Sequence, residues 1–269
     1  FMKINFYKYQ GSGNDFILID NIEGLYNNID PMFISSVCDR KFGIGSDGLI
    51  LIDSNKDYDF TMRYFNSDGS ELGFCGNGSR CIVKFAHKLG IIKKSAIFKA
   101  IDGVHYAEII NNNLIKIKMN DINMGKSNKI TLDNNKLYLN NGSPHLVIRS
   151  KDLDKIDVFS EGRKIRYSNK YNDEGVNINF FEYKSKICKL RTYERGVENE
   201  TLSCGTGAIA TAIALNYSDI DDSNEIKISM KGGDLSISFD RIGEDFSNIW
   251  LSGEANEVYK GEINGNIKK

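Results

Sequence analysis

Two cysteines stand where helices are predicted to begin. Cys75 is followed by Gly76-Asn77-Gly78 and an apolar segment, and Cys204 by Gly205-Thr206-Gly207 and a second segment of small and apolar residues. A thiol at a helix N-terminus lies beside free backbone N–H groups and the positive end of the helix dipole. These favour the thiolate and bind nearby anions. The two motifs therefore predict a pair of reactive thiols.

The two cysteine motifs belong to a longer internal repeat. Tyr64 precedes Cys75 by eleven residues, and Tyr193 precedes Cys204 by the same eleven. The cysteines are 129 residues apart, and two other pairs of segments match at 131 and 130 residues: Gly11-Ser12 with Gly142-Ser143, and Asp102-Gly103 with Gly232-Gly233. Three matches in register indicate one ancestral unit used twice.

A duplicated thiol favours a symmetric reaction. Cysteines from two copies of one unit should be related by an approximate twofold axis and face each other across the domain cleft. One thiolate can then remove a proton from a carbon while the other thiol returns a proton to the opposite face, so the pair titrates as a unit. Two helix N-termini aimed at a carboxylate would stabilise the charge that grows there. This scheme needs no cofactor, and no lysine stands in a setting that suggests a pyridoxal Schiff base.

Composition indicates an ordinary globular protein. The 269 residues suit two domains of about 130 residues each. With a net charge of −1, neither nucleic acid nor an anionic membrane is expected as a partner. No apolar run approaches the length of about 18 residues that spans a bilayer, and the N-terminus lacks a signal-peptide core, which predicts a cytoplasmic protein. The five cysteines have no disulfide-like spacing and are expected to be thiols.

The elements that must position these thiols are mostly strands, which predicts an α/β fold of two similar domains. Helices are expected at Pro31–Asp39, with Asp30 as N-cap, at Cys75–Leu89 and at Cys204–Asn216. Predicted strands cover most of the rest: 3–9, 16–20, 48–53, 58–65, 96–119 as a strand and hairpin, 145–148, 176–182, 187–193, 225–230, 234–239 and 249–252. The domains are predicted as 1–119 and 120–255, with the boundary near Asn120–Asn128. A final strand within 256–269, around Asn256–Ile263, is a candidate to return to the first domain.

Several motifs have an ordinary structural interpretation. The segment Gly43–Gly48 matches a dinucleotide-binding pattern but leads into a strand, so it is predicted to be a tight loop. Cys81, Cys38 and Cys188 are expected in the core, and no metal site is expected, because C-x₅-C without a second pair is poor zinc spacing. His145 is open between a structural and a functional role. Glu194 and Arg195 are adjacent on a strand, so they can share one wall only if the backbone bends there, which the glycine after them allows.

The chain closely resembles the diaminopimelate epimerase family along its whole length. The resemblance is carried by GSGNDF, GIGSDGL, NSDGSE…CGNGSRC, GSPH, GVNINF, YERG…ETLSCGTG and the GGDL strand. It implies two pseudo-twofold-related domains, each a mixed sheet curled around a central helix, and a homodimer. It also implies a cofactor-independent bacterial enzyme that interconverts LL- and meso-diaminopimelate for lysine and peptidoglycan synthesis.

The resemblance also implies roles for single residues. Cys75 and Cys204 match the acid/base pair, with Cys204 as the base for the LL isomer, and His145 matches a histidine that assists the first cysteine. Arg195 would bind the distal carboxylate, and Glu194 the distal ammonium group and the surroundings of the second cysteine. The remaining substrate-binding positions are Asn14, Asn66 and Asn177, together with the helix-start residues Gly76, Asn77, Gly205 and Thr206.

Two departures from the family pattern bear on substrate choice. Ser143 replaces a common asparagine, so one substrate hydrogen bond is shortened or passed to water, and Gly48 replaces a glutamine ligand of some members.

The nearest alternative is an epimerase or racemase of the same build that acts on proline, hydroxyproline or histidine. Arg195 and three asparagines favour a substrate with a second charged amino acid end, which proline lacks. A non-catalytic binding or redox module is the alternative of another class.

Overall fold

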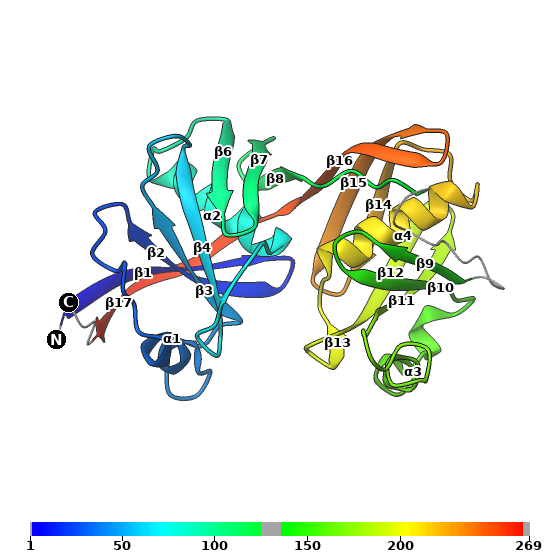
Figure 1. Ribbon diagram of the computed structural model, residues 1–269, viewed down its shortest axis with the longest axis horizontal. Helices are drawn as coiled ribbons and strands as arrows, with labels where there is room; N and C mark the ends of the chain where they lie inside the picture. The colour runs from blue at the N-terminus through cyan, green and yellow to red at the C-terminus, as the bar shows by residue number, and fades with distance from the viewer. Residues whose placement is uncertain (1, 125–135, 266–269) are drawn as a thin grey trace. The chain divides into compact units, whose positions relative to one another are not determined.

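The computed structural model describes residues 2–124 and 136–265. The chain divides into two compact units, one formed by Phe1–Ile117 with Gly253–Lys269 and the other by Lys118–Ser252. Part of the predicted boundary segment 120–128 lies outside the described residues. Each unit is a mixed α/β structure dominated by strands, so the predicted fold class is confirmed (Figure 1).

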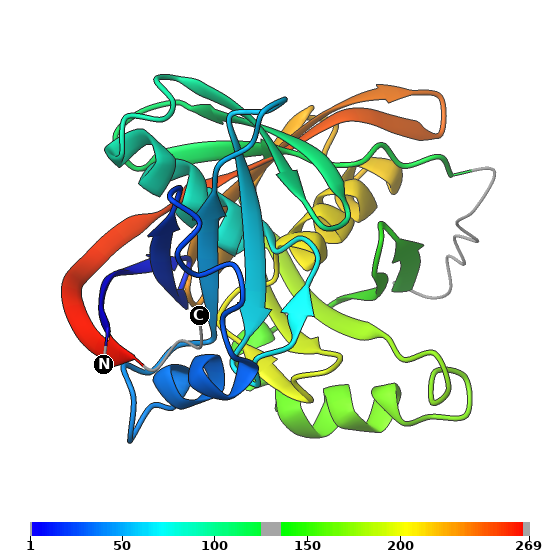
Figure 2. The ribbon, with the colours of Figure 1, turned by 60° about the vertical axis from the view of Figure 1, so that its left-hand side comes forward.

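The described residues of the first unit form two helices and strands of two to ten residues. Its helices are α1 (Pro31–Cys38) and α2 (Gly76–Lys88). Its strands are β1 (Met2–Gly11), β2 (Asn14–Asn21), β3 (Gly48–Asp53), β4 (Phe60–Asn66), β5 (Glu71–Leu72), β6 (Ser95–Ala100), β7 (Gly103–Ile109), β8 (Leu114–Lys118) and β17 (Asn256–Gly265). In Figures 1 and 2 the red strand β17 runs beside the blue strand β1, and the two pair antiparallel from Met2–Gly265 to Gln10–Asn256.

The second unit repeats the order of the first. It has the helices α3 (Val158–Arg166) and α4 (Gly205–Tyr217) and a short 3₁₀ turn at Leu153–Lys155. Its strands are β9 (Lys136–Asn140), β10 (Pro144–Arg149), β11 (Asn177–Lys184), β12 (Ile187–Glu194), β13 (Asn199–Thr201), β14 (Glu225–Met230), β15 (Gly233–Ile242) and β16 (Asp245–Glu254). Thus β9 and β10 correspond to β1 and β2, α3 to α1, and α4 to α2.

Strand pairing makes the correspondence residue-specific. β2 and β3 are parallel with Phe16 opposite Gly48, and β10 and β11 are parallel with His145 opposite Asn177. In both units the next strand along the chain pairs antiparallel with the second of these strands, β4 with β3 and β12 with β11. The strand after the buried helix then pairs parallel with that strand, β6 with β4 and β14 with β12. The repeat predicted from sequence motifs is therefore a repeat of the fold, but the predicted match of Tyr64 with Tyr193 is wrong by one residue. Tyr193 pairs with Ile178, and the corresponding partner of Leu49 is Phe65.

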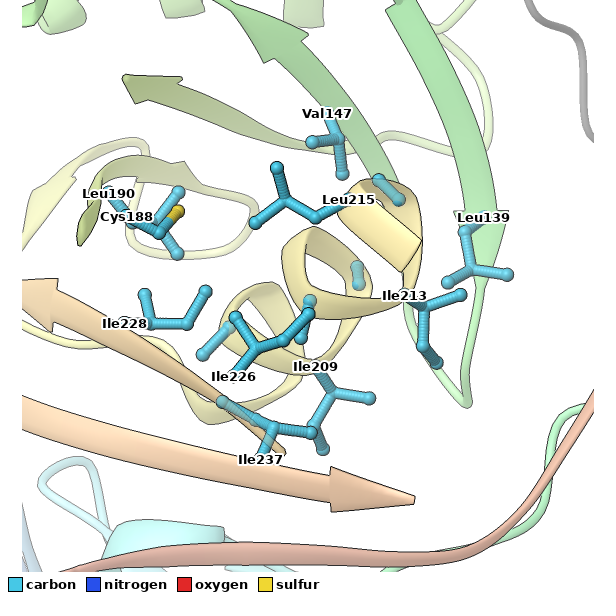
Figure 3. Close-up of a cluster of buried hydrophobic side chains, with 14 of the residues drawn as sticks. Leu139, Val147, Cys188, Leu190, Ile209, Ile213, Leu215, Ile226, Ile228 and Ile237 are labelled. Carbon is cyan, nitrogen blue, oxygen red and sulfur yellow. The ribbon is translucent and has the colours of Figure 1, made fainter. Parts of the chain in front are cut away.

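The helices that follow the two cysteines are the buried ones. α4 is apolar on all sides, and ten of its thirteen residues are buried. Figure 3 shows Ile209, Ile213 and Leu215 of α4 surrounded by side chains from the strands of the second unit. Such all-round burial is typical of a helix enclosed by a curled sheet. In the first unit α2 packs on strands β1 to β4 and β7, and its residues Cys81, Ile82, Val83 and Phe85 are fully buried.

Local signals explain where the helices begin and end. Asp30 caps α1 by accepting from the N–H of Met32, with Pro31 at the first position, as predicted. α2 ends at Lys88, and Gly90 follows with φ of +77°, a conformation that glycine adopts without strain. α3, β5, β9 and β13 were not predicted. β5 and β13 have two and three residues, too few to show a period, whereas α3 and the alternating run of β9 are short amphipathic patterns that the sequence analysis passed over.

No helix among the described residues is long and apolar enough to cross a membrane.

Candidate functional site

In the first unit, Cys75 is the N-cap residue of α2. Its backbone is extended, its carbonyl accepts from the N–H of Ser79, and its Sγ accepts from the N–H of Gly78 at 3.5 Å. The sulfur therefore takes the place of the usual capping oxygen at the positive end of the helix dipole. The side chain is partly exposed. An extended N-cap backbone thus places the predicted thiol where amide N–H groups converge.

Asn14 and Asn77 lie beside Cys75. The Cys75 thiol donates to Asn14 Oδ1 at 3.8 Å, and Asn77 Nδ2 lies 3.4 Å from the same oxygen. Asn14 follows the two-residue turn Ser12-Gly13 of the β1–β2 hairpin, where both residues have positive φ. The hairpin therefore brings a residue far away in sequence to the thiol. Of the sites predicted in the first unit, Cys75, Gly76, Asn77 and Asn14 come together.

An ionic network that the sequence analysis missed orients the Asn14 amide. Asn14 Nδ2 donates to Asp47 Oδ2 at 2.5 Å, which turns Oδ1 toward the thiol. Asp47 and Asp15 are bridged by Arg40, and Asp15 also pairs with the buried Lys8. Burial would raise the pKa of Asp15, but the hydrogen bonds from Arg40 and Lys8 outweigh it and hold that pKa well below its usual range. Asp47 lies in the GIGSDG loop, so the loop predicted to be merely structural positions a site residue.

Arg80 is a fully buried cation one turn into α2. Its guanidinium donates to Asn77 Oδ1 at 2.8 Å, to Ser12 Oγ at 3.0 Å and to the carbonyls of Gly76 and Glu254. These acceptors are all neutral. Burial lowers the pKa of Arg80, and negative charge on Cys81 or Cys75 would oppose that shift. Arg80 thus ties the helix start to the hairpin turn and adds positive charge near Cys75. The corresponding position of α4 is Ile209.

Asn66 and Gly48 lie side by side on β4 and β3. The Tyr64 hydroxyl donates to Asn66 Oδ1 at 2.9 Å, which leaves the Asn66 amide nitrogen for other acceptors. A Cβ atom on Gly48 would lie 2.5 Å from the carbonyl oxygen of Phe65 and 2.7 Å from the Tyr64 ring. The glutamine of some family members therefore cannot fit here without movement of β4.

In the second unit, Cys204 is the N-cap residue of α4. Its backbone is extended, its carbonyl accepts from the N–H of Ala208, and its Sγ lies 3.6 Å from Thr206 Oγ1. Unlike Cys75 it is buried, with 6% of its surface exposed. Cys204, Gly205 and Thr206 thus form the same kind of thiol and helix start as in the first unit.

His145 and Asn177 stand at the start of the parallel pair β10–β11, beside each other in register. His145 is fully buried, and its Nδ1 lies 3.0 Å from Asn179 Nδ2. Burial, and secondarily the charge of Arg195, lower the pKa of His145 to about 3, so the ring is neutral. Asn177 donates to Ser143 Oγ at 2.8 Å and to the Pro144 carbonyl, and accepts from the N–H of Arg195. Ser143, at the place of the family asparagine, therefore holds Asn177.

Glu194 ends β12, and the chain turns sharply after it. Arg195 lies in the turn, and Gly196 has φ of +91°. The bend that the two side chains would need to share a wall is therefore present. Arg195 is exposed, and its Nη1 donates to the carbonyl of Glu174 at 2.8 Å.

The remaining cysteines are structural. Cys38, Cys81 and Cys188 are thiols with 2% exposure or less, and burial raises the pKa of Cys81 and of Cys188 to about 12. The prediction that these three lie in the core is confirmed.

Solved structures share this fold across nearly the whole chain. A phenazine biosynthesis protein of the PhzF family from Bacillus anthracis matches with a TM-score of 0.74 and 17% identity, covering 98% of this chain and 100% of the other. A hydroxyproline epimerase from Agrobacterium vitis matches with a TM-score of 0.65 and 11% identity, covering 97% and 92%. At these identities the likeness defines the fold class alone.

Sequence comparison identifies the family. The family model of diaminopimelate epimerase matches residues 6–130 and 137–258. A diaminopimelate epimerase from Flavobacterium psychrophilum is 48% identical over 96% of this chain and 99% of its own length. One from Aquifex aeolicus is 36% identical over 98% and 99%. The chain belongs to the diaminopimelate epimerase family, an isomerase family acting on amino acids, and the resemblance stated from the motifs is confirmed.

Proposed function

We propose that this protein interconverts LL- and meso-diaminopimelate, with Cys75 and Cys204 as the acid/base pair and without a cofactor. The observation that carries the proposal is the repetition of one device: each unit places a cysteine as the N-cap residue of a thirteen-residue buried helix. Family membership over nearly the whole chain supports the substrate.

The proposed step is a proton exchange at one carbon. A thiolate takes the proton from the α-carbon and becomes a thiol, and the electron pair left on carbon is delocalised into the α-carboxylate. The opposite thiol then gives its proton to the other face and becomes the thiolate, so the roles are exchanged after each turnover. The helix-start amides of Gly76-Asn77 and Gly205-Thr206 would bind the carboxylate and stabilise its growing charge.

The other predicted residues would hold the two ends of the substrate. Asn14, Asn66 and Asn177 would accept and donate hydrogen bonds around the reacting amino acid group. Arg195, whose guanidinium donates to a backbone carbonyl, would bind the distal carboxylate, and Glu194 the distal ammonium group. A cation and an anion for a second amino acid group are features that proline, as an alternative substrate, would not use.

Proton exchange in D₂O tests the reaction and the substrate together. With LL-diaminopimelate we expect meso product that carries deuterium at the inverted carbon, while recovered substrate is nearly free of deuterium at early times. This pattern follows from two separate proton carriers, since a single base would return solvent deuterium to the substrate as well. Exchange with proline, hydroxyproline or histidine and none with diaminopimelate would overturn the proposal.

Single substitutions separate catalysis from a redox or binding role. Cys75→Ala and Cys204→Ala should each abolish epimerisation, whereas Cys188→Ala, a buried thiol elsewhere in the second unit, should retain it. A non-catalytic binding or redox module predicts instead that substitution of Cys75 or Cys204 leaves activity in the cell unchanged and that the two thiols form a functional disulfide. We also propose a cytoplasmic location and a role in lysine and peptidoglycan precursor synthesis. We further propose that the protein is a homodimer, and light scattering at several protein concentrations would test this oligomeric state.

A further inference from the structure

Three buried polar side chains meet beside the start of α4. They are His145, Asn179 and Thr192, here named the His145 cluster, and each is fully buried. A Cβ atom on Gly207 would lie 2.4 Å from Asn179 Oδ1, so the cluster packs directly against the first turn of α4. Neither Asn179 nor Thr192 was predicted from the sequence.

The Asn179 amide can adopt one orientation only. Its Nδ2 lies 3.4 Å from the carbonyl oxygens of Leu146 and Asn177, groups that only accept. Its Oδ1 accepts from the hydroxyl of Thr192 at 3.0 Å. A flipped amide would place oxygen against two carbonyl oxygens, so Nδ2 must face this side.

This orientation fixes the protonation of the His145 ring. Asn179 Nδ2 faces His145 Nδ1 at 3.0 Å, and because Nδ2 donates, Nδ1 must be the bare nitrogen that accepts. In a neutral ring the proton then resides on Nε2. The Nε2 atom is buried and has no hydrogen-bond partner among the described residues. A buried donor without an acceptor costs about 1–3 kcal/mol, which points to an acceptor supplied by a bound molecule or a charged group of the site.

The scaffold itself does not require this cluster. In the corresponding register positions of the first unit, His145 is replaced by Phe16 and Asn179 by Ile50. There the equivalent glycine, Gly78, is surrounded by Ile50, Met62 and Phe16. The same fold is therefore built with an apolar filling in one unit and a polar one in the other.

We propose that Asn179 is a positioning residue that holds His145 as the Nε2–H tautomer, so that the ring donates a hydrogen bond to an anion in the site and does not accept a proton. The anion is either the carboxylate of a bound amino acid or a cysteine thiolate. The identity of this acceptor rests on the proposed function, whereas the tautomer does not.

Nitrogen-15 NMR of the histidine-labelled protein tests the tautomer. The chain has three histidines, and the His145 signals are assigned by their loss in His145→Gln. We expect Nδ1 to be bare and Nε2 protonated in the wild type. Asn179→Asp places a carboxylate against Nδ1 and should protonate that nitrogen. The matched control is Asn216→Asp at the C-terminal end of α4, which should leave the His145 signals unchanged. A protonated Nδ1 in the wild type would overturn the assignment.

Two inactive variants identify the acceptor. If it is a substrate carboxylate, the Nε2–H signal should move when meso-diaminopimelate is added to Cys75→Ser or Cys204→Ser. If it is a thiolate, one of these substitutions should move the signal without ligand. If the Nε2–H signal moves in neither experiment, the donor role of His145 is contradicted. Calorimetry on the same samples shows whether diaminopimelate binds, so failure of the proposed substrate is distinguished from failure of the tautomer. Asn179→Asp should lower kcat/KM by roughly a hundredfold to a thousandfold, the cost of removing one aimed donor, with Asn216→Asp unaffected.

Discussion

Gly207 and Gly78 offer a matched test of how tightly each helix start is packed. Both are the third residue of their helix, Gly207 in α4 and Gly78 in α2. A Cβ atom on Gly207 would lie 2.4 Å from Asn179 Oδ1 and 3.3 Å from Cys204 Sγ. A Cβ atom on Gly78 would meet only ends of apolar side chains, the nearest being Ile50 Cδ1 at 3.0 Å.

The expected costs of alanine differ because the neighbours differ in freedom. In Gly207→Ala, Asn179 must retreat by at least about 0.6 Å to reach even a 3.0 Å contact, which breaks its hydrogen bond to Thr192 or to His145. A buried polar group left unpaired costs about 1–3 kcal/mol. Alanine returns about 1 kcal/mol of helix propensity, so we expect a net loss of up to about 2 kcal/mol. In Gly78→Ala the Ile50 methyl can move by a few tenths of an ångström, and we expect a change within about 1 kcal/mol of zero.

Urea unfolding measures both variants. The single tryptophan, Trp250, lies in the second unit and reports its unfolding by fluorescence, while circular dichroism follows the whole chain. The midpoints of the urea unfolding curves report the change in stability where the m-value is the same for variant and wild type. Equal destabilisation of the two variants, or a stable Gly207→Ala with unchanged His145 NMR signals, would refute the reasoning that Asn179 is held rigidly between α4 and His145.

Two further predictions concern the ionic network beside Asn14. In steady-state kinetics Asp47→Ala should raise KM by roughly tenfold, because Asn14 loses the acceptor that holds its Nδ2 atom. Asp47→Asn keeps an acceptor for Asn14 Nδ2 and should raise KM less. Equal increases in KM would contradict the anchoring role of Asp47. Because the folded-state pKa of Asp15 lies below its unfolded value, its contribution to stability is complete above about pH 4 and is lost as the pH falls further. The difference in unfolding free energy between the wild type and Asp15→Asn should therefore shrink from about pH 6 to pH 3, and a constant difference would show that the ion pairs contribute nothing.

The fold was largely predictable because its signals are local. The cysteine at each helix start, the Asp30-Pro31 cap and Gly90 after α2 each carry a backbone preference that needs no tertiary context. Strands such as Gly48–Asp53 and Glu225–Met230 were predicted to the residue, since each is a compact apolar or alternating run. The strands β5 and β13 were missed because two or three residues show no period, whereas α3 and β9 were missed although each carries a short amphipathic pattern.

The candidate site was predictable in its residue types but not in the residues that hold them. Asn179 lies two residues after Asn177 and therefore on the same face of β11, a signal that was present in GVNINF. Its contact with His145, however, depends on the parallel pairing of β10 and β11, which the sequence does not show. Asp47 and Arg80 reach Asn14 and Ser12 across 33 and 68 residues of chain, so their roles appear only in the folded structure.

The two copies of the unit share a framework but differ in the side chains that pack against the start of the buried helix. In the first unit the buried guanidinium of Arg80 binds the carbonyl and side chain of the residues after Cys75, and apolar side chains surround Gly78. In the second unit the position of Arg80 is the apolar Ile209, and a neutral histidine cluster lies against the helix start instead. A thiolate at Cys75 would gain from the positive charge of Arg80. Duplication therefore kept a cysteine at each helix start, while the side chains packed behind that start diverged from a buried cation to a buried neutral cluster.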